Sequence, residues 1–420
     1  MRIVHLGLGA FHRAHQAWYT AHAGDADAWG IAAFTGRRPD AAVALAEQDG
    51  LYTLVERGPE RDRDEIVGSL VEAVDGADIA RLVELFERPA LAVVTLTVTE
   101  AGYRLRPDGT PDHADSRLAA DLVALRGGGA TLGSHAPSTA LGRLLTGLEA
   151  RRRAGGGPLA VVPCDNLPGN GPLVTRGVTA AAEAVGDGLA SFVAESVRFV
   201  STSVDRITPR ATPGDVDAFN ARAAWRDASP VFTEPFSDWV LSGEFPAGRP
   251  AWEDAGARFV DDIEPWERRK LWLLNGAHTL LAFAGPPREH ATVAAAIADP
   301  DLRAAVDRFW GEAARHLPET LETDAYRDAL LARFTNARIE HRLDQIAQDG
   351  TRKLGLRILP VAEAERAAGR AAPGCAFAVA AWLDAVAAPR ADTAALLAEL
   401  SPALGGDADF VRLVRGLRRR

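Results

Sequence analysis

Four polar residues on one predicted helix have the types and spacing needed for proton-transfer chemistry. Glu267, Lys270, Asn275 and His278 lie in a stretch of mostly apolar residues, and on an α-helix they fall within an arc of roughly 140°. A helix that is apolar nearly all round is a buried helix, and burial disfavours the charged form of a lysine. Lys270 is therefore predicted to be a general base that takes the proton of an alcohol during hydride departure. The alternative is the polar stripe of an ordinary amphipathic helix.

The scarcity of lysine favours a special role for Lys270. Lysine and arginine together number 47, yet only Lys270 and Lys353 are lysines. A guanidinium can replace an ammonium where only charge matters, but it cannot lose a proton near neutral pH. Positions that keep lysine are therefore enriched in roles that arginine cannot fill.

Two loops that follow predicted strands carry further polar side chains. Asn166 comes just after the strand-like segment 159–163, and ligands of open α/β sheets bind beyond the carboxyl ends of strands. Asn166 and Asn275 can each donate a hydrogen bond to an oxygen that gains negative charge. Asp205 follows another strand and is suited to orient the lysine or to bind substrate hydroxyls. The alternatives are an Asx turn at Asn166 and a structural salt bridge from Asp205 to Arg206 or another arginine.

The N-terminal segment contains a candidate dinucleotide-binding turn. Gly7 and Gly9 separate the strand-like segment 2–6 from a helix-like segment at 13–23. The first glycine permits a tight turn, and the second lets the backbone approach a pyrophosphate at the start of the helix. His12 replaces the third glycine of the usual fingerprint. The alternative is a purely structural junction between a strand and a helix.

The end of the second predicted strand, 29–34, bears on the choice of cofactor. It lacks the acidic residue that binds the ribose in many NAD enzymes. Arg37 and Arg38 follow it instead, and they are suited to meet the 2′-phosphate of NADP. The alternative is a solvated loop.

Composition excludes several classes of protein. The net charge of −10 opposes a general nucleic-acid binder, which needs a basic face. There is no run of about 18 apolar residues and no signal-peptide pattern, so we expect no membrane association. Two cysteines cannot form a disulfide framework, which indicates a cytoplasmic location. Metal-ligand motifs are missing, so no metal is predicted. We expect a monomer or a small homo-oligomer.

Strand-like and helical segments alternate over the first part of the chain and imply a mostly parallel, doubly wound sheet. From about residue 263 the pattern becomes helical. We therefore predict an α/β Rossmann-type N-terminal domain at 1–262 and a mostly α-helical domain for substrate binding and catalysis at 263–420. The proline-rich break at 209–213 is an earlier alternative for the boundary.

Several stretches, in one order along nearly the whole chain, resemble the polyol-specific long-chain dehydrogenases, the mannitol dehydrogenase family. They are 3–16, 97–103, 164–168, 204–209, 233–236, 270–278 and 349–354. The resemblance implies a Rossmann-type domain, a helical domain and an active site between them, with metal-independent hydride transfer.

The resemblance also implies roles for individual residues. Lys270 corresponds to the general base, and Asn166 and Asn275 to the two oxyanion donors. His278 and Asp205 support them, and Glu267 lines a proton path to solvent. The predicted cofactor site comprises Gly7, Gly9, Ala10, Phe11, His12, Arg37 and Thr97.

Within the family, the segments 48–54, 333–342 and 345–347 are most similar to the mannonate oxidoreductase branch. We therefore expect NAD, or else NADP, and a sugar acid or a polyol and its ketose, with D-mannonate and D-fructuronate as the expected pair. A carboxylate substrate needs cationic partners, for which Arg342, Lys353 and Arg357 are candidates. The alternatives are a mannitol- or arabinitol-type polyol dehydrogenase and a non-catalytic NAD(P)-binding sensor. The predicted substrate-binding residues are Asn166, Asp205, Lys270, Asn275, His278, Arg342 and Lys353.

Overall fold

The computed structural model describes residues 1–126, 136–387 and 391–419. The glycine-rich stretch 127–133, which its composition predicts to be a loop, lies outside these residues. The chain forms two compact units. One comprises Met1–Arg57 and Asp62–Ile263, and the other comprises Gly58–Arg61 and Glu264–Arg420. The sequence predicts the boundary after residue 262, and the first unit of the structure ends at Ile263.

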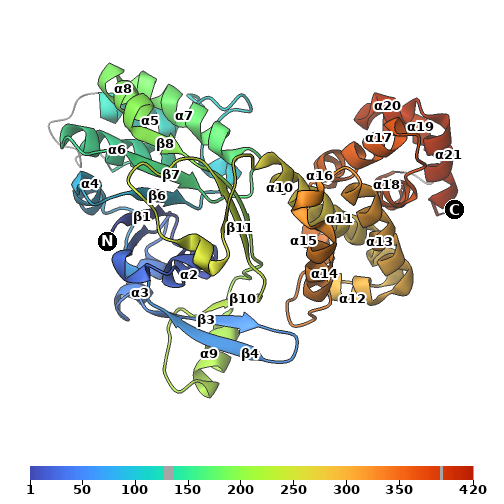
Figure 1. The fold of residues 1–420 in the computed structure, drawn as a ribbon, viewed down its shortest axis with the longest axis horizontal. Coiled ribbons are helices and arrows are strands. Elements are labelled where there is room, and N and C mark those ends of the chain that lie inside the picture. Colours follow the sequence, from blue (N-terminus) through green and yellow to red (C-terminus); the bar gives the residue numbers. More distant parts are fainter. Residues whose placement is uncertain (127–135, 388–390, 420) are drawn as a thin grey trace. The chain divides into compact units, whose positions relative to one another are not determined.

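A six-stranded parallel sheet forms the centre of the N-terminal unit, in the order β5-β2-β1-β6-β7-β8 (Figure 1). This is the strand order of the Rossmann fold, in which the chain changes direction across the sheet between the first strand and the fourth. Here that switch point lies between β1 and β6. The strands are β1 (Ile3–Leu6), β2 (Ile31–Phe34), β5 (Leu70–Val74), β6 (Val93–Leu96), β7 (Leu159–Pro163) and β8 (Val197–Phe199).

Two three-stranded sheets complete the unit. In one, β3 (Tyr52–Arg57) pairs antiparallel with β4 (Asp62–Val67) and parallel with β10 (Val231–Thr233). In the other, β11 (Asp238–Ser242) pairs antiparallel with β9 (Ser201–Asp205) and parallel with β12 (Arg258–Phe259). The start of β9 lies beside the end of β7, where the buried Asn170 side chain donates to the carbonyl oxygens of both Pro163 and Thr202.

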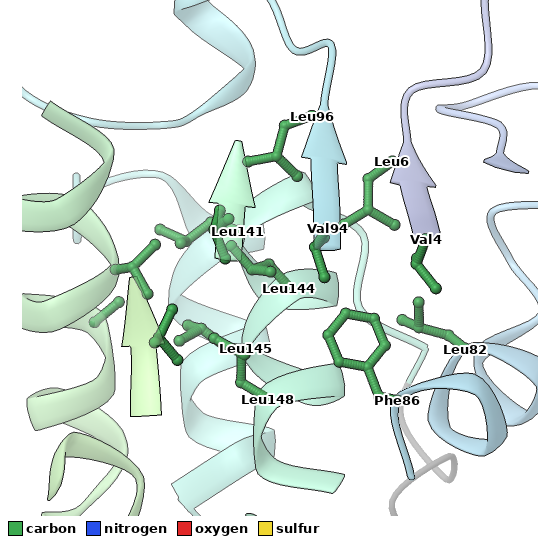
Figure 2. Close-up of a cluster of buried hydrophobic side chains, with 14 of the residues drawn as sticks. Val4, Leu6, Leu82, Phe86, Val94, Leu96, Leu141, Leu144, Leu145 and Leu148 are labelled. Carbon is green, nitrogen blue, oxygen red and sulfur yellow. The ribbon is translucent and has the colours of Figure 1, made fainter. Parts of the chain in front are cut away.

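Helices cover both faces of the six-stranded sheet. Side chains of one face of β1 and β6 meet those of the covering helices in a buried cluster, part of which Figure 2 shows. Successive strand residues point to opposite faces, so Ile3 of β1 belongs to the second core instead. The helices of this unit are α1 (Ala10–Ala14), α2 (Gln16–Ala21), α3 (Asp40–Ala46), α4 (Ile79–Glu87), α5 (Ser116–Arg126), α6 (Ala140–Arg153), α7 (Asn170–Val185), α8 (Asp187–Ser196) and α9 (Pro213–Arg222).

The predicted helix at 13–23 is instead two short helices that meet at His15. The backbone of His15 leaves the helical region, with φ −120° and ψ −90°. Its buried ring nitrogen lies 3.2 Å from the carbonyl oxygen of Asp238. This tertiary contact accompanies the break, which the local sequence does not reveal.

The C-terminal unit is helical over its described residues apart from an isolated bridge between Thr292 and Arg342. No helix among the described residues combines the length and apolar character needed to cross a bilayer. The α-helices are α10 (Glu264–Arg269), α11 (Ala277–Ala284), α12 (Val293–Ala298), α13 (Pro300–Ala314), α14 (Thr323–Phe334), α15 (Leu343–Ile346), α16 (Gly350–Arg357), α17 (Leu359–Ala367), α18 (Pro373–Val386), α19 (Thr393–Leu400), α20 (Pro402–Gly405) and α21 (Ala408–Leu417).

Candidate active site

The turn after β1 has the geometry that a dinucleotide requires. Gly7 has a φ of +117°, and a Cβ there would lie 2.4 Å from the carbonyl oxygen of Thr97. Only glycine fits such a position. A Cβ at Gly9 would meet only the Gly7 carbonyl oxygen, at 3.6 Å, so the backbone of Gly9 is open to close approach. The residues present therefore fit a pyrophosphate at this turn.

Thr97 and His5 support the Gly7 turn through hydrogen bonds. The Thr97 hydroxyl donates to the Gly7 carbonyl oxygen at 2.7 Å, so it must accept its second bond from His5 Nε2, 3.0 Å away. His5 Nδ1 then accepts from the Thr95 hydroxyl at 2.8 Å. Burial lowers the pKa of His5 to about 3, which keeps this ring neutral, and its hydrogen bond to Thr97 sets the tautomer.

His12 lies beneath the turn and not at its surface. Its ring stacks on that of His5, with centroids 3.4 Å apart, and its side chain is fully buried. Burial holds the pKa of His12 well below its usual value. Any contact of residue 12 with a cofactor would therefore be made by its backbone.

A pocket of about 530 Å³ opens beyond the carboxyl ends of β6, β7 and β9. It adjoins the switch point, where ligands of such sheets bind. Phe11, Thr97, Asn166 and Asp205 contribute to its wall, whereas His12 and Arg37 are not among the described residues that line it. The lining residues are Phe11, Thr97, Val98, Thr99, Glu100, Cys164, Asp165, Asn166, Leu167, Val204, Asp205, Arg206 and Thr208.

The loop that carries Asn166 is fixed by its neighbour Asp165. One oxygen of Asp165 accepts from the Leu167 amide at 3.0 Å, which makes an Asx turn at Asp165. The other oxygen accepts from the Tyr103 hydroxyl at 2.6 Å. Burial and the Asp165 charge hold the pKa of Tyr103 well above its usual value. Nothing local in the sequence assigns a role to Tyr103, and this contact shows one.

Asp205 and Arg206 differ in their surroundings. Asp205 ends β9 and lines the pocket. The Arg206 guanidinium is buried, donates to the carbonyl oxygen of Ala14 at 2.6 Å and pairs with Glu56 at 2.5 Å. The Arg206 side chain therefore pairs with Glu56 of β3 and connects it to the end of α1 at Ala14.

The end of β2, where a dinucleotide's ribose would be expected, is basic. Arg37 and Arg38 are exposed, and Arg38 lies 3.4 Å from Asp40. Arg143 of α6 donates to the carbonyl oxygens of Thr35 and Gly36 at 3.1 and 2.9 Å. Sequence reasoning missed Arg143, because nothing local links it to β2.

The predicted catalytic helix is not α-helical throughout. Lys270–Gly276 forms a π-helical segment between α10 and α11. The π-helix pairs residues five positions apart and occurs frequently at functional sites. Lys270 and Asn275 have this spacing and are both half-buried. The π-helical winding therefore places the two side chains closer to the same face of the helix than an α-helix would.

The remaining predicted residues of the C-terminal unit lie in different surroundings. Glu267 is on α10, and His278 is buried on α11. The His278 ring stacks on Phe334, with centroids 4.7 Å apart. Burial, followed by the nearby His341, Arg333 and Arg357, holds the pKa of His278 well below its usual value. His278 is thus a neutral ring.

The three cations proposed for a carboxylate fall into two groups. Arg342 is exposed and pairs with Asp344 at 2.8 Å, so its charge is already compensated. Lys353 and Arg357 are half-buried on α16. Arg357 donates to the Thr279 hydroxyl at 3.1 Å, which ties it to α11.

A Rossmann sheet with a glycine turn and a pocket at its switch point is the architecture of a dinucleotide-binding protein. Two family models match the chain. They are described as the mannitol dehydrogenase Rossmann domain, at residues 1–254, and the mannitol dehydrogenase C-terminal domain, at residues 262–394. The chain therefore belongs to the mannitol dehydrogenase family. Within the described residues, no group of three His, Cys, Asp or Glu is placed to hold a metal ion.

Similar proteins agree with this assignment. An uncharacterized oxidoreductase of Escherichia coli, YeiQ, is 38% identical over 85% of this chain and 73% of its own length. The D-mannonate oxidoreductase of the same organism is 37% identical over 91% and 79%. The structure of Pseudomonas fluorescens mannitol 2-dehydrogenase with NAD and D-mannitol has a TM-score of 0.79 at 29% identity, over 99% of this chain and 91% of that one.

These findings confirm the predicted family, fold class and enzymatic nature. The protein is a dehydrogenase with a Rossmann-type domain and a helical C-terminal domain. They also confirm the prediction of a nicotinamide dinucleotide as cofactor.

Proposed function

We propose that the protein interconverts the secondary alcohol of a sugar acid and its ketone, with D-mannonate and D-fructuronate as the pair. The reaction is metal-independent, and Lys270 is its general base. One observation carries the proposal: Lys270 and Asn275 stand five positions apart in a π-helical segment, where a proton acceptor and an amide donor serve one oxygen. The similarity to a D-mannonate oxidoreductase supports the substrate.

The oxidised nicotinamide supplies the hydride acceptor. In its neutral form, the Lys270 amine accepts the hydroxyl proton while the adjacent C–H bond breaks and the C=O bond forms. Asn275 and Asn166 donate hydrogen bonds to the oxygen as it gains negative charge. Asp205 and the neutral His278 bind substrate hydroxyls. In the reverse direction, the Lys270 ammonium returns the proton to the ketone oxygen.

Substitution of Lys270 tests the base directly. Lys270→Arg keeps the charge but cannot release a proton near neutral pH, so we expect kcat to fall by at least about 100-fold, the lower range of general-base contributions. Lys270→Met should lose a similar factor. Both variants should bind NADH as the wild type does, which fluorescence titration measures.

Arg268→Gln is the matched control, because Arg268 is on α10 and pairs with Glu264 on its own helix. It should keep kcat and the pH profile of kcat/KM. Full activity of Lys270→Arg at neutral pH would exclude Lys270 as the base.

The substrate is tested with purified protein and fructuronate, tagaturonate, fructose and xylulose, each with NADH and with NADPH. A preference for fructuronate supports the proposal. The structural similarity to a mannitol 2-dehydrogenase favours the second candidate, a polyol dehydrogenase, which a preference for fructose would establish.

A further inference from the structure

The loop at the end of β2 is held by an arginine of a helix that is distant in the sequence. Arg143 of α6 donates through Nη1 to the carbonyl oxygens of Thr35 and Gly36, at 3.1 and 2.9 Å. Its Nε donates to the carbonyl oxygen of Pro137, 3.2 Å away and just before the start of α6. All three of these bonds go to backbone carbonyl oxygens. One guanidinium therefore connects the end of β2 to the start of α6.

The loop after β5 meets the end of β2 at the same place. The amide of Gly76 donates to the Thr35 hydroxyl at 2.9 Å. A Cβ at Gly76 would lie 2.0 Å from the Thr35 carbonyl oxygen and 2.6 Å from Arg143 Nη1. Residue 76 must therefore lack a side chain for β2, the loop after β5 and the guanidinium to approach one another this closely.

The start of α6, from which Arg143 extends, is itself fixed. Asp121 of α5 is buried and accepts from the amides of Ser138 and Thr139 at 3.1 and 3.0 Å. The Thr139 hydroxyl caps α6, because it accepts from the Gly142 amide at 2.9 Å. The backbone at residue 143 thus has a defined position, from which the guanidinium can hold the end of β2 in place.

The end of β2 borders the expected position of the cofactor's adenosine. Each half of a Rossmann sheet binds one half of the dinucleotide beyond the carboxyl ends of its strands. The half made of β1, β2 and β5 begins with the Gly7 turn, so it is the adenosine half. In many NAD enzymes an Asp or Glu at the end of the second strand binds the ribose hydroxyls. Thr35, Gly36 and Arg37 stand there in this chain, and the first carboxylate after β2 is Asp40.

We propose that Arg143 is a positioning residue for the adenosine half of the dinucleotide. It fixes the backbone of Thr35 and Gly36, which borders the adenosine ribose, although no carboxylate stands at this position. A loop that is ordered before binding increases affinity, because its conformational entropy is already lost on folding. The nicotinamide half is bound beyond β6 and β7 and does not depend on this junction.

Substitution of Arg143 tests the proposal with a ligand that contains only the adenosine half. Arg143→Met removes the three hydrogen bonds and keeps an unbranched side chain. The Kd of ADP-ribose, measured by titration calorimetry, should rise about tenfold, the effect of one lost hydrogen bond to a charged group. In steady-state kinetics the KM of NADH should rise by the same factor, whereas kcat at saturating NADH should not change. An unchanged Kd of ADP-ribose would overturn the proposal.

Arg151→Met is the matched control on the same helix. Arg151 is buried and also donates to backbone carbonyl oxygens, among them those of Leu91 and Gly157 at 3.0 and 2.7 Å. Leu91 precedes β6, so these bonds lie at the amino ends of the strands, opposite the edge where ligands bind. Arg151→Met should lower the free energy of unfolding but leave the Kd of ADP-ribose unchanged. Equal weakening of ADP-ribose binding in the two variants would assign the effect to general loosening and overturn the proposal.

A second variant disturbs the junction without altering the arginine. In Gly76→Ala the added Cβ must displace the Thr35 carbonyl oxygen that Arg143 holds, so the Kd of ADP-ribose should again rise about tenfold. Gly311→Ala on α13 is its control, because a Cβ there would meet no atom within 4 Å, and it should bind ADP-ribose as the wild type does. Wild-type affinity in Gly76→Ala would show that the junction does not position the ribose, and the proposal would fail.

Discussion

The indole nitrogen of Trp310 donates a hydrogen bond to the carbonyl oxygen of Leu273, 2.8 Å away. This contact ties α13 to the middle of the π-helical segment, between Lys270 and Asn275. Trp310 is fully buried, so loss of the bond would leave a buried carbonyl with one donor fewer.

Trp310→Phe should therefore lower the free energy of unfolding by about 1 kcal/mol for the bond, in addition to the loss of ring volume, and should reduce kcat. Urea denaturation and steady-state kinetics measure the two effects. Trp382→Phe is the matched control, because the buried indole nitrogen of Trp382 has no partner among the described residues. It should lose ring volume alone and keep kcat. Equal effects of the two variants on kcat would contradict a role for the Leu273 contact.

Tyr103→Phe should loosen the loop that carries Asn166. The phenol donates to Asp165 at 2.6 Å, and a hydrogen bond to a charged group contributes about 1.5–3 kcal/mol. We expect the KM of the ketose to rise about tenfold. Tyr52→Phe is the control. It removes a buried hydroxyl that donates a hydrogen bond of the same length, 2.6 Å, to the Arg13 carbonyl oxygen. It should reduce stability by about 1 kcal/mol, the effect of a neutral bond, and leave KM unchanged. An equal rise of KM in both variants would argue against positioning by Tyr103.

The free energy of unfolding should fall as the pH drops below about 6.5, because the buried histidines next to the Gly7 turn, His5 and His12, are neutral in the folded chain. The pKa of His5 is lowered from 6.5 to about 3, so between these values the unfolded chain binds a proton that the folded chain excludes. The loss is about 1.4 kcal/mol per pH unit for each such histidine. Urea unfolding at about pH 7, 6 and 5 measures the slope. His5→Asn should reduce the slope, whereas substitution of the exposed His113 should not.

Arg37→Ala tests the cofactor preference at the end of β2. If Arg37 meets a 2′-phosphate, its loss should raise the KM of NADPH about fivefold, the effect of one exposed charge contact, without changing the KM of NADH. Arg38→Ala is the control, since Arg38 lies next to Asp40. A wild type that strongly prefers NADH would show that Arg37 has no such role.

The Rossmann-type sheet could be predicted because several of its strands are short apolar runs and the turn after the first strand contains two glycines, and both signals are local. The segment 159–163 coincides with β7, and the turn at Gly7 has the positive φ that its glycine suggested. Such features depend on neighbouring residues, so a single sequence reveals them.

The details of the site depend on contacts between distant residues and could not be predicted. Tyr103 and Asp165 are 62 positions apart, and no spacing rule joins them. The π-helical winding at Lys270–Gly276 uses residues with ordinary helical preferences, and a partner on α13 supports it. Arg342 is the reverse case, since Glu340 and Asp344 stand beside it in the sequence and already indicate that its charge is compensated.

The winding of the segment at 270–276 also bears on how the helix tolerates a change of chain length. A π-helical turn accommodates an additional residue that an α-helix of the same rise would not contain. Deleting one residue among 271–274 would allow the helix to continue as an α-helix into α11. Lys270 would then stand four positions before Asn275 and seven before His278, and both spacings keep side chains on one face of an α-helix. A relative that lacks one residue here can therefore present the same three side chains on one helix face.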